Sequence, residues 1–87
     1  RLLSFTFHRP PRSDSPREAI HLIANAAATP VDILLPEPPA GMEWKQIVDT
    51  AAPSPHDIVA IDKTTAITEM NVSVGARSTR VYVAYHP

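Results

Sequence analysis

The 87-residue sequence contains no cysteine and only two glycines, Gly41 and Gly75. Without cysteine, neither disulfides nor thiolate-bound metals can hold the fold, and the composition fits a reducing compartment. Two isolated glycines exclude a glycine-rich phosphate-binding loop. No apolar run approaches the roughly 18 residues of a membrane-spanning helix, so we expect no membrane partner.

An excess of either charge is also missing, because eight Lys and Arg stand against nine Asp and Glu. The basic residues are scattered, apart from a loose group at Arg9, Arg12 and Arg17. Nucleic acids attract clustered basic side chains, so we expect no nucleic-acid partner.

Ten prolines are the unusual feature of the composition. Prolines suit the loops and edges of a sheet protein and count against a helical bundle. The length allows one domain, which we place at residues 1–87. Because the chain starts at Arg1, directly before a strand-like run, we expect it to be a fragment or a processed product.

The stretch from Val31 to Asp57 is predicted to organise the fold. Residues 31–35 alternate as a strand, and the prolines of residues 36–39 end it. Residues 44–49 form a second strand, which we expect to pair with the first as a hairpin that needs another layer of sheet. One face of this second strand carries Trp44, Gln46 and Val48, and the other carries Lys45, Ile47 and Asp49.

Further alternating segments occur at residues 2–8, 70–74 and 80–85, and the side of the first that carries Leu3, Phe5 and Phe7 should face a core. Residues 18–26 are interpreted as a buried central strand, with a short helix as the alternative. Ser54-Pro55-His56-Asp57 is typical of a helix start and predicts one helical turn. The sequence therefore predicts an all-β fold, an antiparallel β-sandwich of about seven or eight strands.

Candidate catalytic and metal-binding residues form no recognisable constellation. Glycosidases use two carboxylates about 5–10 Å apart, but the nine carboxylates here lie at turns or on polar strand faces. The four histidines (His8, His21, His56 and His86) show no ligand-like spacing, so we expect no metal and no cofactor.

Trp44 and Tyr82 could stack on a sugar, because each ring offers flat apolar area with a polar handle. Trp44 alternates in phase with Val48, which favours a place in the core. Tyr82 points opposite to Val81 and Val83, which makes it the better surface candidate. Asn71-Val72-Ser73 matches a glycosylation acceptor, which matters only in a secreted protein.

Taken in order, these segments resemble the C-terminal domain of isoamylase-type glycogen and starch debranching enzymes, in the α-amylase superfamily. The segment LLPEPPAGMEW…VDTAAPSPHD looks especially like plant-type isoamylases, whereas residues 62–70 and 85–87 match less well. The residues that carry the likeness, which we interpret as structural, are Asn25, Trp44, Asp49, Asp57 and Arg77.

The resemblance implies a sandwich packed behind a catalytic (β/α)₈ barrel that hydrolyses α-1,6-glucosidic branch linkages with an aspartate and a glutamate. No position here matches those catalytic motifs, so no catalytic residue is assigned. We expect a non-catalytic domain that packs on the barrel and stabilises it, since Ile23, Leu34 and Ile47 leave apolar surface beyond one core. The alternatives are an α-glucan-binding module and an oligomerisation surface. The implied compartment is a bacterial cytoplasm or a plastid stroma.

Overall fold

The computed structural model describes residues 1–8 and 19–86, and the loop predicted at residues 9–17 lies outside this part. Four strands form one sheet in the order β1-β2-β6-β4, and β3 and β5 form a two-stranded ribbon. All strand pairs are antiparallel. The described elements are β1 (Leu2–His8), β2 (Ala19–Asn25), β3 (Val31–Leu34), β4 (Glu43–Asp49), the 3-10 turn η1 (Ile61–Lys63), β5 (Asn71–Val74) and β6 (Ser78–Tyr85).

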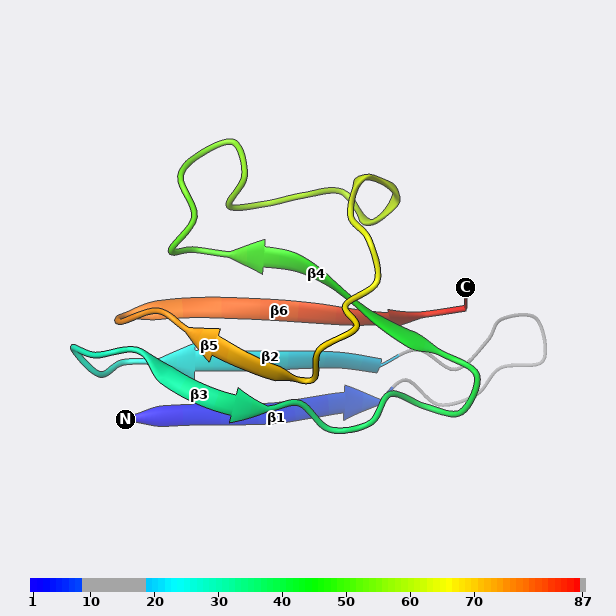
Figure 1. The fold of residues 1–87 in the computed structure, drawn as a ribbon, viewed down its shortest axis with the longest axis horizontal. Coiled ribbons are helices and arrows are strands. Elements are labelled where there is room, and N and C mark those ends of the chain that lie inside the picture. Colours follow the sequence, from blue (N-terminus) through cyan, green and yellow to red (C-terminus); the bar gives the residue numbers. More distant parts are fainter. Residues whose placement is uncertain (9–18, 87) are drawn as a thin grey trace.

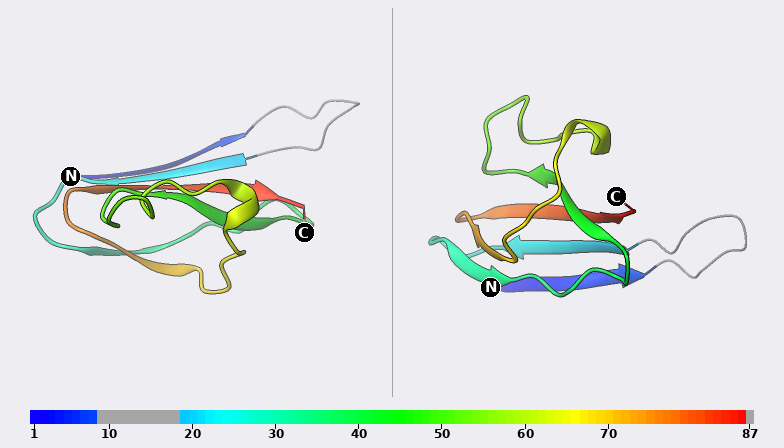
Figure 2. Two further views of the ribbon diagram at one scale, coloured as in Figure 1. Left: turned by 90° about the horizontal axis from the view of Figure 1, so that it is seen from above. Right: turned by 45° about the vertical axis from the view of Figure 1, so that its right-hand side comes forward.

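The ribbon lies against one face of the four-stranded sheet, which makes two layers (Figure 1). The view from above in Figure 2 shows the ribbon on one side of β1, β2 and β6. The core between the layers is built around the fully buried side chains of Ile23, Trp44, Val74 and Tyr82. The predicted all-β antiparallel sandwich is confirmed, with six strands in the described residues instead of seven or eight.

The predicted hairpin between residues 31–35 and 44–49 is wrong. β3 pairs with β5, so that Ile33 lies opposite Val72, whereas β4 pairs with β6 in the other layer. Proline lacks the N–H that a ladder needs, and the proline-rich segment 36–39 carries the chain from the ribbon to the edge of the sheet.

A bulge interrupts the alternation of β4 between Gln46 and Val48. It sets Val48 opposite Val81 and Asp49 opposite Arg80, so these two side chains exchange the faces that strict alternation predicts. A bulge adds one residue to one strand of a pair and re-aims the side chains that follow it. The two-face prediction therefore holds for Trp44 and Gln46 and is wrong for Val48 and Asp49.

The aromatic side of β1 does not face the core, contrary to the prediction. In the β1–β2 register Phe5 lies opposite Leu22 and Thr6 lies opposite His21, and His21 is the buried member of this set. The hydroxyls of Ser4 and Thr6 lie 2.9 Å and 2.6 Å from the two ring nitrogens of His21. The polar side of β1 therefore lies inward, where it provides hydrogen-bond partners for a buried imidazole.

The segment 54–57 forms a hydrogen-bonded turn, in which the His56 N–H donates to the Pro53 carbonyl at 2.8 Å, and it does not start a helix. Further along, the chain returns along the free edge of β4. Backbone bonds join Asp49 to Asp57 at 2.9 Å and Ile67 to Trp44 at 3.0 Å. Segment 57–67 therefore covers the β4 edge of the sheet.

Candidate functional site

The face of the four-stranded sheet that points away from the ribbon is predominantly apolar. We call this surface the outer face. Successive side chains of a strand point to opposite sides, so the strand registers fix its members. They are Leu3, Phe5, Phe7, Ile20, Leu22, Ala24, Val81, Val83 and Tyr85.

Large side chains of the outer face remain exposed to solvent. Leu3 is 56% exposed, Phe7 is 58% exposed and Ile20 is 43% exposed. In the left view of Figure 2, no described strand or helix lies beyond β1 and β2 on this side. Contiguous apolar surface of this kind marks an interaction site in a soluble domain.

The two aromatic side chains considered for sugar stacking are both inside the core. Trp44 and Tyr82 are each 0% exposed, so neither ring offers a face to a ligand in this structure. Tyr82 does point opposite to Val81 and Val83, as the alternation predicts, but the prediction that its side lies at the surface is wrong.

Tyr82 instead belongs to a polar cluster between β4 and β6. Arg80 Nη1 donates to Gln46 Oε1 at 3.2 Å and to the Tyr82 hydroxyl at 3.3 Å, and Arg80 Nη2 lies 3.5 Å from Asp49 Oδ2. Burial raises the pKa of Tyr82 above 10.0, while its hydrogen bond with Arg80 acts in the opposite direction. The phenol therefore stays protonated at neutral pH and serves as a hydrogen-bond partner.

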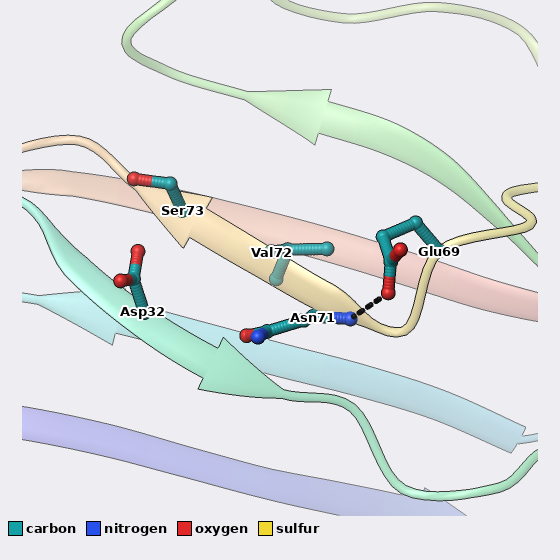
Figure 3. A pocket seen from close by; sticks show the side chains of 5 residues that line it. All are labelled: Asp32, Glu69, Asn71, Val72 and Ser73. Carbon is teal, nitrogen blue, oxygen red and sulfur yellow. Dashed lines mark hydrogen bonds between the residues drawn. The ribbon is translucent and has the colours of Figure 1, made fainter.

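A shallow hollow of about 340 Å³ lies on the ribbon, lined by Asp32, Glu69, Asn71, Val72 and Ser73 (Figure 3). Its two carboxylates belong to exposed residues, and Glu69 Oε1 accepts a 3.2 Å hydrogen bond from the backbone N–H of Asn71. Sugar sites combine polar groups with an apolar ring for stacking, and no aromatic residue lines this hollow. The hollow has the chemistry of a hydrated strand surface.

The residues that carry the family resemblance lie at turns and layer contacts. Asn25 is buried, and its Nδ2 donates to the carbonyls of Thr29 at 2.9 Å and Gly75 at 3.1 Å. Asn25 Oδ1 accepts from the Ala27 N–H at 3.0 Å, so this one side chain ties the β2–β3 turn to the β5–β6 turn.

Arg77 and Asp49 stabilise turns as well. The Arg77 backbone has φ 49°, in the left-handed region, and its N–H donates to the Ala27 carbonyl at 3.0 Å. Asp49 Oδ1 accepts from the Ala51 N–H at 3.0 Å, which is the Asx-turn expected at the end of this strand.

Within residues 1–8 and 19–86, no three His, Asp or Glu side chains lie close enough together to hold a metal ion. In the same residues, the structure has no helix that is long and apolar enough to cross a membrane.

Two packed antiparallel layers and one exposed apolar face define the class of the protein: a small β-sandwich domain built to contact a partner. A family model described as the C-terminal domain of isoamylase 1-3 matches residues 1–85. The chain therefore belongs to the family of isoamylase C-terminal domains. A search among curated proteins returned no match.

Proposed function

We propose that the chain is the non-catalytic C-terminal domain of an isoamylase-type enzyme, which hydrolyses α-1,6-glucosidic branch linkages in glycogen or starch. Its role is to pack on the catalytic barrel and to stabilise it. Membership of the isoamylase C-terminal family supports the parent enzyme. The compartment, a bacterial cytoplasm or a plastid stroma, stays a prediction.

The observation that carries this proposal is the outer face. Leu3, Phe7 and Ile20 each leave 43% or more of their surface in water, although they sit on the same sheet that forms the core. Fully burying one such side chain contributes about 1.5–3 kcal/mol, so covering several of them would hold two domains together. The residues first expected to need a cover were Ile23, Leu34 and Ile47, but Ile23 lies in the core.

The experiment uses an isoamylase barrel from which its own C-terminal domain has been removed. The 87-residue chain is added in trans, and binding is followed by calorimetry together with the thermal midpoint of the barrel. We expect binding and a raised midpoint. Ile20→Lys places a charge in the outer face and should weaken binding about tenfold or more, which corresponds to about 1.4 kcal/mol.

Leu34→Lys is the matched control, because Leu34 is 74% exposed on the ribbon, on the other side of the molecule. It makes the same chemical change and should leave binding unaltered. The proposal fails if the chain does not bind the barrel, or if Leu34→Lys weakens binding as strongly as Ile20→Lys.

An α-glucan-binding role has no comparable support, because Trp44 and Tyr82 are both buried. We do not propose it as a second function.

A further inference from the structure

The two edges of the four-stranded sheet differ in chemistry and in cover. The β4 edge carries Glu43 and Lys45 and is bonded along its length to segment 57–67. The β1 edge carries no charged side chain from Leu2 to Phe7, and no strand within residues 1–8 and 19–86 pairs with its outer side. Natural sheets protect a free edge with charge, proline or a covering loop, and residues 2–7 contain neither charge nor proline.

The free backbone groups of β1 can be assigned. The Ala26 N–H donates to the Arg1 carbonyl at 2.8 Å, so Arg1 bonds toward β2. Residues of an antiparallel strand alternate in the direction of their backbone groups, so Leu3, Phe5 and Phe7 also bond toward β2. The groups that point away from the sheet are therefore those of the polar positions Ser4 and Thr6 and of the end positions Leu2 and His8.

We propose that this edge pairs with the same edge of a second copy of the chain, antiparallel and around a two-fold axis at Phe5. In this register Phe5 lies opposite Phe5 of the other copy, Leu3 lies opposite Phe7, and Ser4 lies opposite Thr6. Each pairing places like with like, since the aromatic and aliphatic side chains all belong to the outer face and the hydroxyls to the inner face. The interface is isologous, as a two-fold dimer requires.

The hydrogen-bond pattern agrees with the same register. Ser4 and Thr6 would form hydrogen-bonded pairs through the groups that already point outward. The Phe5 pair would be a non-hydrogen-bonded pair, in which Cα atoms approach to about 4.5 Å and side chains pack most closely. A shift by one residue would set outward-pointing groups against inward-pointing ones, so it cannot form the ladder.

The expected dimer is weak. One strand junction is a small interface, and interfaces below about 1,200 Å² are typically transient. The uncharged sequence of residues 2–7 presents no like-charge repulsion to the second copy. A two-fold axis normal to the sheet keeps both outer faces on one side, so pairing uses the edge and leaves the outer face to the barrel. This inference therefore goes beyond the proposed accessory role.

The test is sedimentation of the 87-residue chain from about 1 μM to about 1 mM, the range that separates weak association from none. We expect a monomer–dimer equilibrium. Phe5→Lys and Phe5→Glu each set like charges opposite one another across the axis and should each give a monomer. An equimolar mixture of the two variants should restore the dimer, because the charges then attract.

Ile20→Lys is the control variant, since it introduces the same charge on the outer face but on β2, away from the edge. It should dimerise as the unaltered chain does, although it should lose the barrel. In hydrogen exchange, the amides of Ser4 and Thr6 should be protected at the high concentration and exposed on dilution, whereas that of Phe5 should be protected at both.

Three results would overturn the proposal: a monomer throughout the range, a dimer that survives Phe5→Lys, or a mixture of the charged variants that stays monomeric. Association abolished by Ile20→Lys would also overturn it, because the outer face would then be the contact. None of these results bears on whether the chain binds the barrel, so the two proposals fail separately.

Discussion

The indole Nε1 of Trp44 donates a 2.8 Å hydrogen bond to the backbone carbonyl of Pro36. Pro36 lies just after β3 and Trp44 lies at the start of β4, so the bond spans the segment that crosses from the ribbon to the sheet. The indole is completely buried, and its N–H would cost free energy there without an acceptor. One side chain thus fills the core and fixes the crossing between the layers.

We expect Trp44→Phe to lower the free energy of unfolding by about 2 kcal/mol. About 1 kcal/mol comes from the lost hydrogen bond, and the remainder comes from the smaller buried ring. Urea unfolding followed by circular dichroism measures the change. Tyr85→Phe is the control, because it removes a polar atom from a half-buried ring on the outer face and should change stability by less than about 0.5 kcal/mol. Equal effects of the two substitutions would contradict the role given to the Trp44–Pro36 bond.

Asn25 supports a second prediction, because its amide satisfies backbone groups of two turns at once. Asn25→Leu keeps the size of the side chain and should cost about 2–3 kcal/mol, since the carbonyls of Thr29 and Gly75 lose their donor. The same change at the exposed Asn71 should cost less than about 0.5 kcal/mol. Thermal unfolding of the two variants gives the comparison. If Asn25→Leu is as stable as Asn71→Leu, the two turns do not depend on this amide.

Alternation in the sequence correctly located the strands at residues 2–8, 19–25, 31–34, 43–49, 71–74 and 78–85, because period-two patterning is a local property. It could not supply the partner of each strand. The pairing of β3 with β5 joins residues about forty positions apart, and nothing near Val31 or Val74 records it. The proline-rich segment looked like a hairpin turn although it is a crossing between layers.

Alternation also left open which side of a strand faces the core. The valines of β6 looked like core and Tyr82 looked like surface, yet the structure has the reverse arrangement. The inner layer is filled by rings whose polar atoms find partners, such as Tyr82 with Arg80, while the purely apolar side is the outer face. Hydrophobicity alone therefore predicted that a second cover is needed but assigned it to the wrong side.

His21 supports a prediction about pH. The ring is buried on the inner side of β2, where Ser4 and Thr6 provide its hydrogen bonds and the Trp44 ring centre lies 6.1 Å away. Burial lowers the pKa of His21 below its ordinary value of 6.5, because the charged imidazolium loses its hydration. In the unfolded chain the same ring titrates near 6.5.

The sign of the effect follows from proton binding. Above about pH 6.5 the ring is neutral in both states and contributes nothing to the pH dependence. Below it the unfolded chain binds more protons than the folded one, so the free energy of unfolding falls as the pH drops toward the folded pKa. The slope is at most about 1.4 kcal/mol per pH unit, and the loss levels off below the folded pKa.

His21→Gln isolates this contribution, because an amide can bridge the same two hydroxyls without titrating. Urea unfolding between about pH 8 and about pH 5 should give a flatter profile for His21→Gln than for the unaltered chain, with the two diverging only below about pH 6.5. His56→Gln removes an exposed imidazole and should leave the profile unchanged. Carboxylates titrate alike in all three proteins, so they cancel in the differences. Parallel profiles for His21→Gln and the unaltered chain would show that the imidazole is hydrated in the folded state, which is incompatible with its burial against Trp44.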